Sequence, residues 1–154
     1  MTLPRLSARV APLAAHARGL EAELTMHLPS DVGLIEEAVE LVARHLEAHF
    51  VDRRTIRFNC RVALSEALAN AIVCGNLSDP SKHVAVRVQF GRTAIEMEVA
   101  DEGDGFRPEQ LPDPTAPEHL SSPDGRGIFL IRRLMDEVRF NDKGNAICMI
   151  LRRA

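Results

Sequence analysis

The chain has 154 residues, of which 45% are hydrophobic, and this size and content suffice for one domain with a full core. Its formal net charge is -3, and it contains six Phe but no Trp or Tyr. Neither a basic field nor a surface for stacking bases therefore points to nucleic acid. The three cysteines (Cys60, Cys74 and Cys148) lack CxxC spacing and indicate a reduced, cytoplasmic setting. No apolar run reaches the roughly 18 residues of a membrane span, so we expect no membrane association.

The first twenty residues differ in character from the rest of the chain. They are interrupted by Pro4, Pro12 and Gly19 and lack a clean apolar core. We expect residues 1–20 to be an N-terminal extension, poorly ordered or partly helical, and residues 21–154 to form a single domain. A first strand over residues 22–28 is expected to end at Pro29. Ser30 or Asp31 then resembles the N-cap of an amphipathic helix over residues 32–50.

A second helix is predicted from about residue 55 to residue 74. It is mostly apolar or small, and Gly75 fits a left-handed residue at its end. Two strands follow, over residues 83–90 and 93–100, because apolar and polar residues alternate there. A third helix over residues 128–135 precedes a closing hairpin over residues 137–140 and 146–151.

Between the strand over residues 93–100 and the third helix, residues 103–125 show no periodicity. They hold five of the nine prolines, at positions 108, 112, 114, 117 and 123. A loop of this length is usually a functional lid or a disordered segment, and we expect a lid. The element order predicts a two-layer α/β (α+β) sandwich, with a mixed, mostly antiparallel sheet of about five strands and three helices on one face.

Glu66 and Asn70 stand out inside the second predicted helix. Their spacing of four places both side chains on one stripe of the helix. A buried carboxylate costs several kcal/mol unless it is paired, solvated or bound to a ligand. Asn is a neutral oxygen ligand suited to Mg²⁺, and Glu can accept a proton from a hydroxyl nucleophile. The alternative is a partly exposed Glu beside an Asn that bonds to the backbone.

Two later glycine-containing motifs complete the pattern. In DEGDGF, Asp101 ends a strand and can accept a hydrogen bond from an exocyclic amine, while Gly103 and Gly105 allow close approach to a flat ligand. In GRGIFLI, Gly125 and Gly127 precede a helix start suited to phosphate, and Arg126 adds a forked donor. Taken singly, DEGDGF could equally be an ordinary Asp-Gly turn. GRGIFLI could be the end of a flexible loop with a solvated Arg.

Taken in this order, the motifs resemble those of the GHKL (Bergerat-fold) ATPases, with their histidine-kinase-like ATPase fold. Within that family they resemble the anti-sigma factor serine-protein kinases of the RsbW and SpoIIAB type. ALSEALANAIVCGN is similar to the N box, VADEGDGF to the first glycine box and GRGIFLIRRLMDEV to the second. The resemblance covers roughly residues 23–152. It departs from the family at Cys74, where His is frequent, and at Asn145, where Thr is frequent.

The resemblance implies an ATP- and Mg²⁺-dependent kinase. Glu66 would be the general base and Asn70 the Mg²⁺ ligand. Asp101 would read adenine, beside Gly103 and Gly105, and residues 125–127 would meet the phosphates. Such proteins phosphorylate a serine of an anti-anti-sigma (STAS-domain) partner and sequester a sigma factor, commonly as homodimers. Two alternatives remain: a nucleotide-gated binding module with little or no kinase activity, and an interaction protein without nucleotide.

Overall fold

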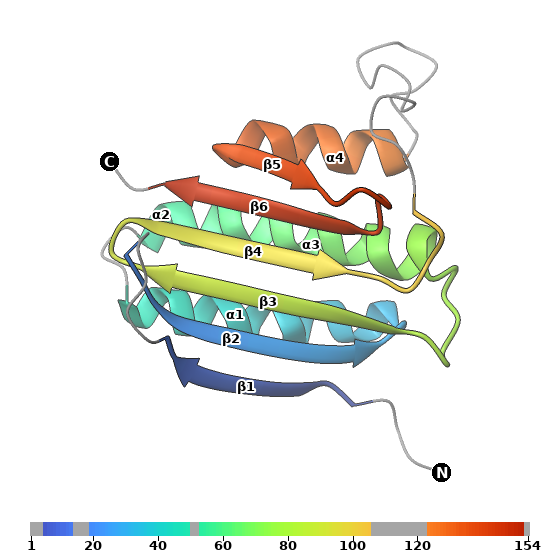
Figure 1. Cartoon of the computed structure of the whole chain (residues 1–154), viewed down its shortest axis with the longest axis horizontal. Coiled ribbons are helices and arrows are strands. Elements are labelled where there is room, and N and C mark those ends of the chain that lie inside the picture. Colours follow the sequence, from blue (N-terminus) through green and yellow to red (C-terminus); the bar gives the residue numbers. More distant parts are fainter. Residues whose placement is uncertain (1–4, 14–18, 50–52, 106–122, 153–154) are drawn as a thin grey trace.

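The computed structural model describes residues 5–13, 19–49, 53–105 and 123–152. A six-stranded sheet in the order β1-β2-β3-β4-β6-β5 is antiparallel at every pairing and carries the helices on one face (Figure 1). The strands are β1 (Ser7–Pro12), β2 (Leu20–Pro29), β3 (His83–Gly91), β4 (Ala94–Ala100), β5 (Glu137–Phe140) and β6 (Ala146–Arg152). The helices include α1 (Ile35–His49), α3 (Arg61–Ala69) and α4 (Pro123–Leu134). The expected two-layer fold is confirmed, with six strands rather than about five.

Alternation along the strands produces the core. In β3 and β4, Val84, Val86, Met97 and Val99 point to the helices and are at most 2% exposed, while Arg87 and Glu98 pair at 3.2 Å on the opposite face. Such one-sided burial is typical of antiparallel sheets. Helix α3 packs between α1 and α4, so the middle of the helical layer is the most deeply covered. Glu66 is therefore held on the best-supported helix of the domain, and Asn70 directly follows that helix.

The N-terminal extension does not match its prediction. Residues 7–12 form β1, which pairs with β2 from Ser7 opposite His27 to Pro12 opposite Ala22. An edge strand buries little, and five of these six residues are exposed. The apolar alternation that marks a buried strand is consequently absent, which explains the wrong expectation. Of the other residues in the predicted extension, 1–4 and 14–18 lie outside the described part of the chain.

The helix that carries Glu66 is longer and less regular than expected. A continuous helical path runs from Arg53 to Gly75, through a short helix α2 (Arg53–Thr55), a π-helical segment η2 (Ile56–Cys60), α3 and a second π-helical segment η3 (Asn70–Gly75). The left-handed residues that follow are Leu77 (φ 53°) and Ser78 (φ 56°), not Gly75. π-helical turns are rare and are frequently found at functional sites.

Helix α4 begins at Pro123, five residues before its predicted start. Proline suits the first helical position because its missing N–H would have no acceptor there. Gly125, Arg126 and Gly127 therefore belong to the helix instead of preceding it. Most of the predicted lid, residues 106–122, lies outside the described residues. Within the described ranges, no helix has the length and hydropathy to cross a membrane.

Candidate functional site

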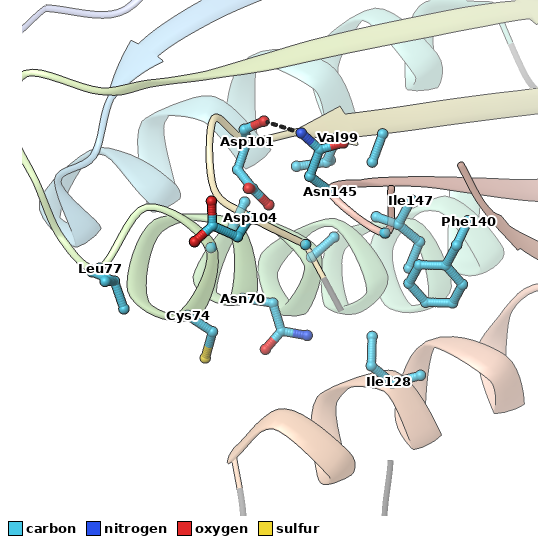
Figure 2. A pocket seen from close by; sticks show the side chains of 16 residues that line it. Asn70, Cys74, Leu77, Val99, Asp101, Asp104, Ile128, Phe140, Asn145 and Ile147 are labelled. Atoms are coloured by element: carbon cyan, nitrogen blue, oxygen red, sulfur yellow. Dashed lines mark hydrogen bonds between the residues drawn. The ribbon is translucent and has the colours of Figure 1, made fainter. Parts of the chain in front are cut away.

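A cavity of about 350 Å³ opens between the helical layer and one end of the sheet. Its walls come from α3, η3, α4, the loop after β4 and the closing hairpin (Figure 2). Much of the surface is apolar, from Ala67, Ala71, Val99, Ile128, Phe140 and Ile147. The polar side chains on the wall are Asn70, Asp101, Asp104 and Asn145. An apolar hollow with a few convergent polar groups is the usual form of a small-molecule site.

Asp101 is the polar centre of the cavity's sheet end. Gly103 N–H donates to its Oδ1 at 2.7 Å, and its own N–H donates to the carbonyl of Asn145 at 2.9 Å. Burial raises the pKa of the Asp101 carboxyl, while the Gly103 hydrogen bond and the charge of Lys143 act in the opposite direction. A half-buried carboxylate with one oxygen already engaged suits recognition of a single directed donor.

Glycines around Asp101 are required by close packing. A Cβ on Gly75 would overlap the Asp101 carboxylate, and a Cβ on Gly103 would overlap the carbonyl of Gly75. Gly105 has a φ of 84° and would carry its Cβ into the carbonyl of Lys143. Gly103 and Gly105 therefore shape the loop at this end of the cavity, and Gly75 allows the helix to end against Asp101.

Glu66 and Asn70 meet α4 at the other end. A Cβ on Gly127 would stand 2.9 Å from Glu66 Oε2 and 3.5 Å from Asn70 Nδ2, so the buried Gly127 faces both side chains. Asn70 lines the cavity, and Figure 2 shows its amide in the space before α4. Glu66 is absent from this lining and instead borders a shallower hollow between α1 and α3, together with Glu36 and Arg61. The acid therefore lies at the boundary between two hollows.

The first turn of α4 brings backbone N–H groups to this region. The N–H groups at a helix start have no intrahelical acceptors, and the helix dipole adds partial positive charge there. Gly125 belongs to this turn, whereas Gly127 contributes mainly by lacking a side chain. Arg126 is exposed and is not among the residues that line the cavity. Its guanidinium is thus accessible from solvent at the start of α4.

Several residues that sequence reasoning missed contribute to the site. Asp104 adds a second acidic side chain to the cavity, and Phe140 and Ile128 add apolar walls. Asn76 is fully buried beneath the loop after β4. Asp104 stands inside DEGDGF and was available as a signal, but the role of Asn76 depends on contacts with distant segments.

The two departures from the resembled family both lie at the cavity. Cys74 is exposed and lines its mouth near Leu77 (Figure 2). Asn145 Nδ2 donates to the carbonyl of Asp101 at 3.1 Å, and its Oδ1 accepts from Asn141 Nδ2 at 2.7 Å. The amide at position 145 therefore has protein partners on both sides.

Comparisons with known proteins agree with this fold. A family model described as the histidine kinase-like ATPase domain matches residues 28–151. Serine-protein kinase RsbW from Bacillus licheniformis is 31% identical over 128 residues, which cover 79% of this chain and 78% of that protein. RsbW from Bacillus subtilis (strain 168) gives the same identity and coverage. RsbW from Oceanobacillus iheyensis is 31% identical over 96 residues, 58% of this chain and 61% of that protein.

Proposed function

Because the chain belongs to the histidine kinase-like ATPase family and is related to the RsbW serine-protein kinases, we propose that it is an ATP-dependent protein-serine kinase and anti-sigma factor. The observation that carries the proposal is the convergence of Glu66, Asn70 and the start of α4 beside a cavity that holds Asp101 at its other end. This arrangement offers a nucleotide one site for its base and another for its phosphates.

In the proposed complex, the base lies at the sheet end of the cavity. Asp101 accepts a hydrogen bond from the exocyclic amine of adenine, and Gly103 and Gly105 let the ring approach the backbone. The apolar walls from Val99, Ile128 and Ile147 cover the faces of the base. The phosphates extend towards the first turn of α4, where Gly125 offers its N–H and Arg126 offers a charged fork.

The residues at the phosphate end fit a Mg²⁺ ion. Asn70 lines the cavity, and its neutral amide oxygen is a suitable ligand because Mg²⁺ commonly takes one or two protein oxygens together with waters and substrate phosphates. When bound, the ion supplies charge neutralisation for the phosphate oxygens. The small Gly127 leaves room for these groups beside Glu66 and Asn70.

Glu66 is proposed as the general base for phosphoryl transfer. The acceptor serine Oγ attacks the γ-phosphorus, a new O–P bond forms, and the bond to the β–γ bridging oxygen breaks to release ADP. The serine proton passes to the Glu66 carboxylate. Positioning and charge neutralisation account for most of the catalysis in such transfers. The part proposed for Glu66, at the boundary of the two hollows, is to accept this proton.

The proposed acceptor is a serine of an anti-anti-sigma (STAS-domain) protein, and the proposed second partner is a sigma factor. These two partners are proposed from the relationship to RsbW. We propose a homodimeric state and a cytoplasmic location on the same basis. The test is incubation with Mg-ATP and the protein encoded beside it, followed by mass spectrometry for phosphoserine. Phosphoserine on that partner is expected with wild type and not with Glu66→Ala.

The outcomes separate three functions. Tight nucleotide binding without phosphoserine on any candidate partner would replace the kinase with a nucleotide-gated binding module. Calorimetry with Mg-ADP is the second measurement. No heat of binding at millimolar nucleotide would refute both the kinase and the gated module.

A further inference from the structure

Two asparagine side chains hold a single peptide unit from opposite ends. Asn145 Nδ2 donates to the carbonyl of Asp101 at 3.1 Å, and Asn76 Oδ1 accepts from the N–H of Glu102 at 2.7 Å. That carbonyl and that N–H belong to the same planar group, the peptide bond between Asp101 and Glu102. The first of the two bonds is drawn in Figure 2.

We propose that Asn76 and Asn145 are positioning residues that orient the Asp101 carboxylate and so set the selectivity of the site for the base. This inference rests on the proposed nucleotide binding. It concerns two side chains from segments far apart in sequence, the end of the Glu66 helix and the closing hairpin.

Asn76 is built to be immobile. Its side chain is fully buried, and its Nδ2 donates to Ser30 Oγ at 2.9 Å and to the carbonyl of His83 at 3.1 Å. Ser30, itself buried, donates in turn to the carbonyl of Lys82 at 2.8 Å. Both donors and the acceptor of the amide are thus engaged, and breaking any of these bonds leaves a buried polar group without a partner. Asn76 therefore ties the loop after β4 to the ends of β2 and β3.

Asn145 is held by its own turn. Asn141 Oδ1 accepts from the N–H groups of Gly144, Asn145 and Ala146 at 2.8, 3.0 and 3.2 Å, which fixes the backbone of the hairpin. Asn141 Nδ2 then donates to Asn145 Oδ1 at 2.7 Å, so the Asn145 amide can present only its Nδ2 to Asp101. The contact to Asp101 is consequently the end of a chain of hydrogen bonds.

The consequence for Asp101 follows from backbone geometry. Holding both dipolar ends of a planar peptide fixes the ψ angle of Asp101 and the φ angle of Glu102. The Gly103 N–H then engages Oδ1, and Gly75 sets a wall behind the carboxylate. None of the described residues donates to the second oxygen, Oδ2, which remains for a ligand. A carboxylate fixed in this way loses little freedom when the amine of a base binds to it.

The test uses two nucleotides that differ only at the reading position. ADP carries the exocyclic amine, and purine riboside 5′-diphosphate lacks it. We expect Asn145→Ala to weaken ADP binding by about 5-fold, the usual effect of one hydrogen bond, and to leave purine riboside diphosphate binding within about 2-fold. In the Asp101→Ala background, Asn145→Ala should change ADP affinity by less than about 2-fold, because the two residues act through one contact.

A matched control comes from an asparagine that does not line the cavity. Asn59 Nδ2 donates to the carbonyl of Leu134 at 2.8 Å, the same type of bond away from the cavity, so Asn59→Ala should leave the ratio of the two affinities unchanged. Asn76→Ala, like Asn145→Ala, should lower the affinity for ADP relative to that for purine riboside 5′-diphosphate. Thermal unfolding checks that this variant folds. If it does not fold, Asn145→Ala alone decides the question.

Two failures are distinguishable. If wild type binds neither nucleotide, the proposed function is wrong. If wild type prefers ADP but Asn145→Ala weakens both nucleotides equally, or has its full effect without Asp101, the asparagines only support the fold and the inference is overturned.

Discussion

The two ends of the cavity are built differently. At the sheet end, the N–H and carbonyl of Asp101 and the N–H of Glu102 are all hydrogen-bonded, and one Asp101 carboxylate oxygen is already engaged. At the helix end, Glu66 and Asn70 form no side-chain hydrogen bond or ion pair with any of the described residues, and Gly127 stands against them. One end is fixed by the protein, and the other is left for a ligand to complete.

This difference indicates a division of work. Polar groups that are bonded in advance recognise a shape at little entropic cost. Polar groups left without protein partners retain their capacity to bind an ion or to take a proton. Changes at the Asp101 end should therefore act on nucleotide affinity, and changes at the Glu66 end should act on the chemical step.

The largest effect is expected for Glu66→Gln. The amide keeps the shape of the side chain but cannot accept the serine proton, so the rate of phosphoryl transfer should fall about 10²- to 10⁴-fold while ADP affinity changes little. Phosphoserine formation on the partner and calorimetry with Mg-ADP measure the two quantities. Glu37→Gln, an exposed glutamate on α1, is the matched control. Transfer at the wild-type rate by Glu66→Gln would remove Glu66 from the mechanism.

Gly75→Ala should give the next largest effect, on affinity. The new Cβ overlaps a carboxylate that cannot move freely, so we expect ADP affinity to fall about 10- to 100-fold and the free energy of unfolding to drop by about 1–3 kcal/mol. Calorimetry and urea denaturation test both. At Gly33, a Cβ would stand 3.1 Å from the side chain of Asp31, away from the cavity, and Gly33→Ala should leave ADP binding intact. Unchanged affinity in Gly75→Ala would show that Asp101 is not fixed.

The same substitution at Gly127 should act on transfer. The nearest atom is the end of the Glu66 side chain, which can move away cheaply, and alanine favours a helix by up to about 1 kcal/mol. Stability should therefore hold or rise, while displacement of the base slows phosphoryl transfer about 10-fold. Single-turnover kinetics beside thermal unfolding would reveal this separation. A loss of stability with normal transfer would contradict it.

A smaller effect is expected from pH. Burial raises the pKa of Asp101, so its carboxylate takes up a proton at a higher pH than an ordinary aspartate at about 3.9. As pH falls through the raised pKa, ADP affinity should decline because the acceptor is lost. The contribution of Asp101 to folding stability should improve over the same range, since protonation removes the cost of a buried charge. Measuring ADP affinity as a function of pH for wild type and for Asp101→Asn separates the titration of Asp101 from that of the ADP phosphates.

The smallest effect concerns Cys74. Burial raises the pKa of the Cys60 thiol to about 12, and Cys60 should react slowly with iodoacetamide, whereas the exposed Cys74 should react first. Since Cys74 lines the cavity, Mg-ADP should slow its labelling several-fold, as followed by mass spectrometry of tryptic peptides. Cys74→Ser should retain ADP affinity within about 2-fold. A rate of Cys74 labelling that Mg-ADP does not change would place the ligand away from Cys74.

Much of the fold could be predicted from the sequence because elements that are buried on one side have regularly spaced apolar residues. Strands β3 and β4 alternate cleanly, and α1 carries its glutamates on one face. β1 was missed because a strand paired on one side buries too little to leave that period. The start of α4 was predicted too late because glycines suggest a loop. In the structure Gly127 lies within the helix, where a side chain would come too close to Glu66.

At the site, residue types were readable and contacts were not. Glu66, Asn70 and Asp101 are predicted as site residues from the chemistry of their side chains and from their order. The structure brings Asn70 and Asp101 to one cavity and Gly127 against Glu66, whereas Arg126 stays at its exterior. The roles of Asn76 and Asn145 depend on partners 26 and 44 residues away, and a single sequence does not encode such pairings visibly.

The π-helical segment from Asn70 to Gly75 sets where the chain leaves the helix. Asn76 N–H bonds to the carbonyl of Ala71, five residues back, so this last turn holds one residue more than an α-helical turn. Removing one residue between Asn70 and Gly75 would restore ordinary spacing and rotate Asn76 by about 100° around the helix axis. Its side chain would then miss Ser30, His83 and Glu102 together. The length of this turn is therefore a register constraint: a one-residue deletion here should disturb the site more than most substitutions, although it removes none of the proposed ligand contacts.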